Sequence, residues 1–511
     1  MYNFFIKLLC KKQIMKPAFK YILDQEWEAI EFPITISSFE NIKAFYGFGN
    51  DTKIKLWRDE NFKLVGILSG TNANPKFINK DTFIGKGNII EGAAIKGKDE
   101  RGYSIEISGC IIVSMSSNSW QSNDVGYFFE CDLQIDKISI DYNSTEAKGD
   151  TKRLDWFLSS ASELQLTETT LRREPPNDLK VRIGIDEYDE SNDDTKRKLG
   201  GSWSKDYANI EIEQLKFIIA QVPKGILNNH FNGLCFEFRN QEGYRIPDAN
   251  LINNIKNLVS FLIGNKITAI GYSVFSGSEI IKSVCYSIDN YSIQLSKKTA
   301  MPPIKFNRQY NWGNIQWLLN TMLKNYIQSE KEYKLNEVLS RYWIALSLPL
   351  GVNLPILANA IEILAFEYLK KNGELKTETI PTEEYTRLIE AELLSLENKL
   401  SNYKDGNIIL NKFKSANQRG SSEKINHFFN LLGIERGKQE KAAINLRNKM
   451  VHSARDYSKD DKIFDDLILS RVYQVLFNRV LLKLLGYEHY YIDYSIKNCP
   501  VKHISIHSGE E

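Results

Sequence analysis

The sequence has few cysteines and no long apolar run. Its six cysteines are scattered over 511 residues without a CxxC pair, which argues against a small disulfide scaffold and against a zinc finger. We expect reduced and mostly buried thiols in a cytoplasmic protein. No uncharged run approaches the roughly 20 residues that cross a bilayer, so we predict a soluble chain. The N-terminal stretch MYNFFIKLLC lacks the cleavage site of a signal peptide.

An excess of charge of one sign is also missing. The chain has 66 Lys and Arg against 64 Asp and Glu, a formal net charge of only +2. No overall electrostatic field therefore indicates a polyanionic partner, and a nucleic-acid site would have to come from local clustering. Such a cluster exists between residues 401 and 450, where ten basic residues stand against four acidic ones, a local balance of +6.

Several motifs that would fix a chemistry are absent. The chain has no GxxxxGK[ST], no HExxH and no GxSxG. The glycine-containing stretches at 47–51 and 85–92 lack the strand, loop and helix setting of a dinucleotide site, so we predict hairpin turns there. We predict no metal site and no cofactor.

The N-terminal half alternates in hydropathy with a period of two, which is typical of β-strands. DLQIDKISIDY at 132–142 is an example, and its phase changes near Lys137 as it would at a β-bulge. One helix is predicted between Asp248 and Gly264. We therefore predict a β-rich domain over 25–305, preceded by an N-terminal segment over 1–24. The charged stretch 187–203 is expected to be a loop that could divide this domain into two subdomains.

From about residue 312 the period becomes 3.6, which predicts an all-α bundle over 312–490 and a C-terminal tail over 491–511. Gly373 and Gly486 are predicted to end two of the helices, the second with an apolar contact from Tyr487. The domain boundary is expected between 300 and 312. The predicted fold class is therefore α+β and multidomain, with a β-rich half followed by a helical bundle.

The stretch LRNKMVHSARDYSKDD at 446–461 contains Arg447 and His452. Leu446 lies on the apolar side of the predicted helix, and Arg447 lies at the margin of that side. SKDD at 458–461 can cap the final helix, so the helix with the motif should end between His452 and Ser458. Residues five apart point about 140° away from each other. The two side chains are therefore expected to flank a groove and not to contact each other.

This pair fits RNA cleavage without a metal, which needs a base, an acid and a cation that stabilises the phosphate. Histidine can serve as base or acid, and a guanidinium can hold two phosphate oxygens. Because one chain offers one such histidine, a two-fold dimer would complete the site. The basic residues predicted to bind RNA phosphates, unless they are ordinary solvent-facing residues, are Lys449, Arg455, Lys441 and Lys438.

The residues RNKMVH resemble the R-x4-H pattern of HEPN domains, with the polar Asn448 after the arginine. The helical half looks like the ApeA-like HEPN group, and the β-rich half resembles, more loosely, the N-terminal domain of such proteins. This resemblance implies a metal-independent endoribonuclease in which Arg447 and His452 are catalytic and Asn448 supports them. Ala454 stands where HEPN toxins that are silenced by AMP transfer have a tyrosine, so that regulation is not expected.

The resemblance also implies a biological setting. It is that of a bacterial anti-phage protein of the abortive-infection type, a toxin that acts as a homodimer or a higher homo-oligomer. Its substrate would be host or phage RNA, with tRNA as one candidate. The N-terminal domain would sense a phage-derived trigger or restrain the nuclease.

Some alternatives remain open at this level. Glu362 either orients a catalytic cation or is a carboxylate at the rim of its helix, and Asn448 could equally be an exposed helix residue. The helical half could be a catalytically inactive HEPN module for dimerisation or RNA binding. The β-rich half could be a β-sandwich that binds a ligand. Its aromatic candidates, most of which we expect in the core, are Trp57, Trp120, Trp156 and Trp203.

Overall fold

The computed structural model describes most of the chain. The described residues are 34–40, 51–72, 94–119, 127–142, 151–159, 166, 168–173, 179–183, 202–222, 232–240, 244–277, 279–298, 300–306, 314–350, 352–452 and 463–510. The predicted N-terminal segment 1–24 and turn 85–92 lie outside them. So do nearly all of the predicted turn 47–51 and of the predicted loop 187–203.

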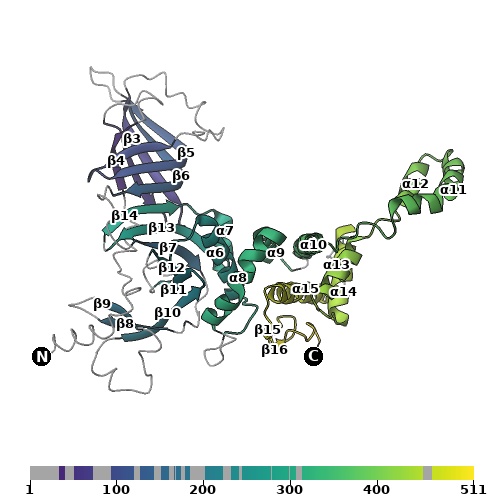
Figure 1. Ribbon diagram of the computed structural model, residues 1–511. Coiled ribbons are helices and arrows are strands. Elements are labelled where there is room, and N and C mark those ends of the chain that lie inside the picture. Colours follow the sequence, from purple (N-terminus) through teal and green to yellow (C-terminus); the bar gives the residue numbers. More distant parts are fainter. Residues whose placement is uncertain are drawn as a thin grey trace, which may run out of the picture. The chain divides into compact units, whose positions relative to one another are not determined.

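The chain is α+β and divides into two compact units (Figure 1). The first unit comprises residues 1–302 and 306–320, and the second comprises residues 303–305 and 321–511. The first is rich in strands and the second is mainly helical. Residues 491–511, predicted as a tail, belong to the second unit. None of the described helices combines the length and the apolar composition needed to cross a bilayer.

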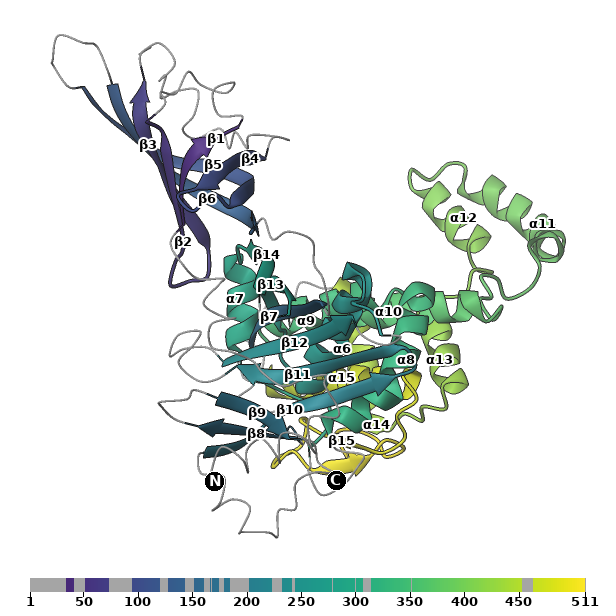
Figure 2. The same cartoon turned by 60° about the vertical axis from the view of Figure 1, so that its left-hand side comes forward.

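Part of the first unit is a closed six-stranded barrel in the order β3-β2-β1-β4-β5-β6, in which β3 also pairs with β6 (Figure 2). Its strands are β1 (Ile34–Phe39), β2 (Lys53–Arg58), β3 (Leu64–Asn72), β4 (Ile95–Asp99), β5 (Ser104–Ser119) and β6 (Tyr127–Asp141). The alternation in KIKLWR explains why β2 is a strand: Ile54 and Leu56 are buried, while Lys53 and Lys55, which alternate with them, are exposed. This confirms the interpretation of period two as strand.

The strand β6 belongs both to the barrel and to a larger open part of the sheet. It pairs with β3 up to Ile135 and with β14 from Lys137 onward. The predicted bulge at Lys137 is wrong, because the register shift between β5 and β6 lies in β5, between Ile112 and Ser114. The change of phase instead marks the residue at which β6 changes its partner.

The open part of the sheet continues in the order β14-β13-β7-β12-β11-β10-β8-β9, so the described strands of the first unit form one continuous sheet rather than the two facing sheets of a sandwich. The strands are β7 (Thr151–Ser159), β8 (Glu168–Arg173), β9 (Leu179–Ile183), β10 (Ser202–Ile212), β11 (Leu215–Val222), β12 (Asn232–Asn240), β13 (Thr268–Ser276) and β14 (Glu279–Tyr286). The helices of this unit are α6 (Ala249–Ile263) and α7 (Asn290–Lys297). The predicted helix is confirmed, since the Asp248 carboxylate caps α6 and Gly264 ends it with φ of +65°.

The first unit has an apolar core that includes Trp156, which is 1% exposed. Four of the cysteines are buried free thiols, namely Cys110, Cys131, Cys235 and Cys285, whereas Cys499 is exposed. Burial raises the pKa of Cys110 to about 12 and that of Cys131 to about 11. These two thiols are therefore poor nucleophiles at neutral pH.

The second unit is built mainly from helices. They are α8 (Ile315–Tyr333), α9 (Leu335–Ser347), α10 (Leu354–Lys371), α11 (Thr382–Leu400), α12 (Gly406–Lys414), α13 (Ser421–Leu431), α14 (Lys438–His452) and α15 (Ile463–Leu484). The first six residues of α8 (315–320) belong to the first unit. In the second unit, α10 packs against α9, α13, α14 and α15. The predicted ends are confirmed: Gly373 has φ of +71° and Gly486 φ of +81°. Tyr487 is buried, and its N–H donates to the Leu482 carbonyl at 3.0 Å.

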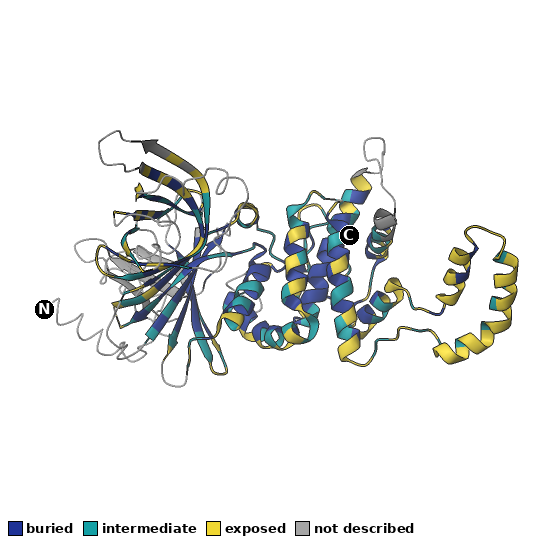
Figure 3. Ribbon diagram, turned by 90° about the horizontal axis from the view of Figure 1, so that it is seen from above, coloured by how far each residue is buried: buried dark blue, intermediate teal, exposed yellow. Residues whose placement is uncertain are grey.

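The pair α11–α12 forms an arm whose surface is largely exposed (Figure 3). No residue of α11 is buried, and α12 buries only Gly406 and Leu410. Two antiparallel segments form the neck of the arm. In the neck, the Thr379 N–H donates to the Asn417 carbonyl at 2.9 Å, and the Asn417 side-chain amide donates to the Ile380 carbonyl at 2.8 Å.

Candidate functional site

The helix with the motif is α14, which runs from Lys438 to His452. Leu446 is buried as predicted, Ala443 is buried as well, and α14 packs against α10 and α15. The helix is described as far as His452, and the region 453–458 in which it is predicted to end lies outside the described residues. Ser458 and its predicted cap lie outside the described residues.

Arg447 lies at the margin of the buried side, and its side chain is 16% exposed. Its guanidinium contacts the carboxylate of Glu362 in α10, which is 23% exposed. The hydroxyl of Ser421, the first residue of α13, donates to the same carboxylate at 2.8 Å. Of the two roles considered for Glu362, the geometry fits the one in which it orients a cation. Three helices thus meet at this arginine.

A fourth helix contributes to the electrostatic surroundings of Arg447. Tyr473 of α15 is buried, which raises its pKa, and the positive charge of Arg447 opposes that rise. A guanidinium presents its N–H donors as a rigid planar fork, so a carboxylate on one edge fixes the direction of the other edges. The arrangement can therefore aim a cation at an anionic ligand.

The structure describes the side chains of only some of the predicted site residues. The backbone of α14 is continuous through His452, so positions 447 and 452 lie about 140° apart around the helix, as expected. The side chains of Asn448, Lys449 and His452 lie outside the described residues, as does the whole of Arg455. The structure therefore brings Arg447 together with Glu362, and it describes no contact of the histidine.

The remaining predicted basic residues lie at the start of α14. Lys438 and Lys441 are both exposed. Among the described residues, no group of three His, Cys, Asp or Glu side chains could hold a metal ion. The described polar groups near Arg447 include the Glu362 carboxylate and the hydroxyl-bearing side chains of Ser421 and Tyr473.

A buried ion pair beside this site was missed in the sequence. Arg479 of α15 is 1% exposed and contacts Glu440 of α14, which is 0% exposed. Glu440 also accepts the Ser508 hydroxyl at 2.6 Å, and Arg479 donates to the Ile504 carbonyl at 3.0 Å. The pair therefore fastens the C-terminal segment, with the hairpin β15 (Tyr490–Ile492) and β16 (Val501–His503), to the bundle. The sequence does contain an indication of this pair. Arg479 lies within the apolar run LFNRVLLKLL, and a charged side chain on a buried apolar helix needs a partner of opposite charge.

Comparison of the chain with protein families, with curated proteins and with solved structures finds no match. The resemblance to ApeA-like HEPN proteins therefore rests on the pattern of residues in the chain itself.

Proposed function

We propose that the protein is a metal-independent endoribonuclease that cuts RNA with Arg447 and His452. The observation that carries the proposal is the position of Arg447. It contacts Glu362 at the margin of the buried side of α14, five residues before a histidine at the last described position of the same helix. A partly buried arginine with a fixed orientation suits the recognition of a phosphate better than a freely moving one does.

The chemistry needs only the groups of the protein. A base removes the proton of the ribose 2′-OH, and the resulting oxygen attacks the adjacent phosphorus. The P–O5′ bond breaks, and an acid protonates the departing 5′ oxygen. Arg447 offsets the negative charge that builds up on the phosphate oxygens. The products are a 2′,3′-cyclic phosphate and a 5′-hydroxyl end.

Two histidines serve this reaction better than one, because base and acid act at opposite ends of the breaking bond. A two-fold dimer brings the same patch of each subunit together and so supplies both from His452. We therefore propose a homodimer as the smallest active form. The specific activity should then fall on dilution below the concentration at which the dimer dissociates.

The biological role that fits this activity is anti-phage defence in the bacterial cytoplasm, as the resemblance to ApeA-like HEPN proteins implies. In this role the helical unit is the toxin and the β-rich unit regulates it in response to a phage-derived trigger. Host or phage RNA, including tRNA, is the substrate.

Incubation of the purified full chain with total RNA in EDTA tests the proposal. We expect cleavage with cyclic phosphate ends by the wild type, and none by His452→Ala or Arg447→Ala. His427→Ala and Arg341→Ala are matched controls, because they remove a partly exposed histidine of α13 and a partly exposed arginine of α9. Both should cleave like the wild type.

An inactive adaptor gives a different result in the same assay. Such a protein would bind RNA but leave it intact at every protein concentration, with or without EDTA. Cleavage that persists in His452→Ala would also contradict the proposal, provided that the variant elutes like the wild type in size-exclusion chromatography.

A further inference from the structure

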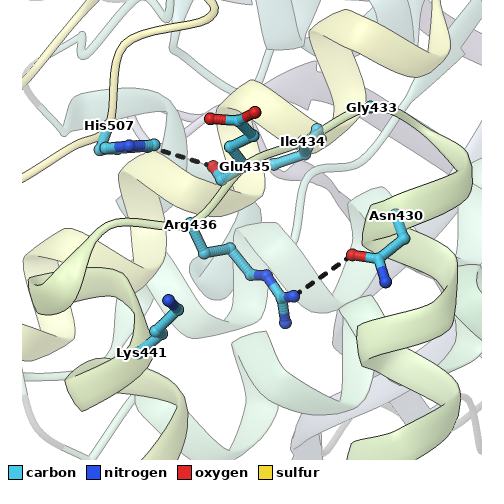
Figure 4. A pocket seen from close by; sticks show the side chains of 7 residues that line it. All are labelled: Asn430, Gly433, Ile434, Glu435, Arg436, Lys441 and His507. Carbon is cyan, nitrogen blue, oxygen red and sulfur yellow. Dashed lines mark hydrogen bonds between the residues drawn. The ribbon is translucent and has the colours of Figure 1, made fainter.

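A pocket of about 480 Å³ opens near the start of α14, between the end of α13 and the C-terminal segment (Figure 4). Its walls carry two cationic side chains, one imidazole, one amide and one carboxylate. The lining residues are Asn430, Gly433, Ile434, Glu435, Arg436, Lys441 and His507. The pocket lies wholly within the second unit.

Neither cation of the pocket is paired with a carboxylate in the part of the chain that the structure describes. Arg436 contacts the amide oxygen of Asn426 and, at 3.4 Å, that of Asn430. Its guanidinium lies 5.2 Å from the centre of the Phe429 ring, and its partial burial lowers its pKa. Among the residues that the structure describes, neither Arg436 nor Lys441 forms an ion pair. Two unpaired cations that line one cavity favour an anionic ligand.

His507 places a second requirement on the ligand of the pocket, besides negative charge. Its Nδ1 lies 3.2 Å from the Glu435 carbonyl oxygen, which can only accept, so Nδ1 carries the proton (Figure 4). In the tautomer with a single proton on Nδ1, Nε2 is an acceptor, which suits a hydroxyl donor and not a phosphate oxygen. A ligand that combines a phosphate with a hydroxyl satisfies all three side chains. The ribose 2′-OH is such a donor, and it distinguishes RNA from DNA.

The pocket also has a defined relation to the proposed cleavage site along α14. Positions 441 and 452 are eleven residues apart, which places them within about 20° of each other around the helix and roughly 16 Å apart along it. Positions 445 and 448, both asparagine, share this stripe. A polar stripe therefore runs along α14 from the pocket to the position of His452.

We propose that this pocket binds one nucleotide of the RNA strand, a few nucleotides from the bond that is cut. Arg436 and Lys441 hold its phosphate, and His507 Nε2 accepts its 2′-OH. The inference rests on the proposed function, since it identifies a binding position for the same substrate. It also separates Lys441, which lines the pocket, from Lys438, which does not.

Binding to the full-length His452→Ala protein tests the proposal without cleavage. The probes are a fluorescent single-stranded oligoribonucleotide and the oligodeoxyribonucleotide of the same sequence, followed by anisotropy. Lys441→Ala should weaken RNA binding about fivefold at 0.1 M salt and reduce the slope of log K against log salt by about 0.7, because one phosphate contact is lost. Lys331→Ala removes an exposed lysine of α8 that does not line the pocket, and it should change binding less than twofold.

His507→Phe tests the second half of the proposal, because it removes the acceptor and should reduce the preference for RNA over DNA. Equal binding by Lys441→Ala and Lys331→Ala would overturn the proposed RNA-binding role of the pocket but not the proposed nuclease activity, which the cleavage assay tests. If Lys441→Ala binds RNA more weakly but the wild type never cleaves it, the RNA-binding role stands and the nuclease proposal fails. Displacement of the oligoribonucleotide by micromolar AMP would assign the pocket to a free nucleotide and overturn the RNA proposal.

Discussion

The guanidinium of Arg447 in α14 contacts the carboxylate of Glu362 in α10. Both side chains are mostly covered, so water screens their interaction less than it would at an open surface. Ser421 donates to the same carboxylate, which limits the positions that Glu362 can take. We therefore regard Glu362 as a positioning residue, which acts on the substrate only through the arginine.

Glu362→Gln is expected to lower the kcat of RNA cleavage about tenfold, with a smaller effect on KM. The reason is that the charge of Arg447 remains available to the phosphate while its orientation is lost. Initial rates over a range of concentrations of a fluorogenic RNA separate the two parameters.

Glu367→Gln is the matched control for this change. Glu367 lies in the same helix and pairs with Lys334 at 2.6 Å, so its loss also removes a partnered carboxylate from α10. It should leave cleavage unchanged. If Glu362→Gln cleaves as fast as the control, Glu362 does not position the arginine.

The buried pair of Arg479 and Glu440 predicts a large effect on stability. Arg479→Met should cost about 3–5 kcal/mol of unfolding free energy, because it leaves the Glu440 carboxylate buried without its cation. The double variant with Glu440→Gln should recover part of this loss, since a neutral amide oxygen can still accept from Ser508. Urea unfolding followed by circular dichroism measures both.

Lys483→Met in the same helix is the comparison, because Lys483 pairs with Glu488, whose side chain is 60% exposed. Its cost should stay below about 1 kcal/mol. An Arg479→Met variant that is no less stable than Lys483→Met would contradict the assignment of a buried pair.

The described secondary structure follows well from local periodicity. Alternation predicted the strands, and a change of period predicted where helices begin, because both depend on which side of an element is buried. The phase change in β6 was detected, but its cause was not. A change of pairing partner depends on β3 and β14, which are distant in the sequence, and no local pattern in β6 contains that information.

In the candidate site, too, features that depend on one helix could be predicted, and contacts between distant segments could not. The position of Arg447 at the edge of the buried side follows from its place in one helix. Its contact with Glu362 depends on how α10 and α14 pack, and the sequence left two roles open for that carboxylate. The pocket near the start of α14 combines residues of two segments, so His507 could not be associated with Arg436 before the fold was known.

The exposed arm predicts that α11 and α12 are dispensable for folding. Replacing residues 381–416 by a two-residue Gly-Ser linker should change the Tm by less than about 3 °C, because α11 buries no residue and the neck holds the two ends together. Calorimetry compares the variant with the wild type. A Tm that falls by about 10 °C or more would mean that the arm stabilises the bundle.

Lys256 of α6 predicts a dependence of stability on pH. Burial, together with the nearby charge of Lys266, lowers the pKa of Lys256 from 10.5 to about 8. Below pH 8 the ammonium is charged in both the folded and the unfolded state, so the full cost of burying the charge is present. Between pH 8 and 10.5 the unfolded state binds more protons, and stability should therefore rise with pH.

Lys256→Met removes this cost and should raise the unfolding free energy by about 2 kcal/mol at pH 7, but by much less at pH 10. Urea unfolding followed by tryptophan fluorescence at the two pH values measures the difference. Lys55→Met, at an exposed position of β2, should have a small effect that is the same at both. An equal gain from Lys256→Met at pH 7 and pH 10 would show that the gain comes from the added apolar contact, since only the cost of a buried charge disappears as Lys256 loses its proton.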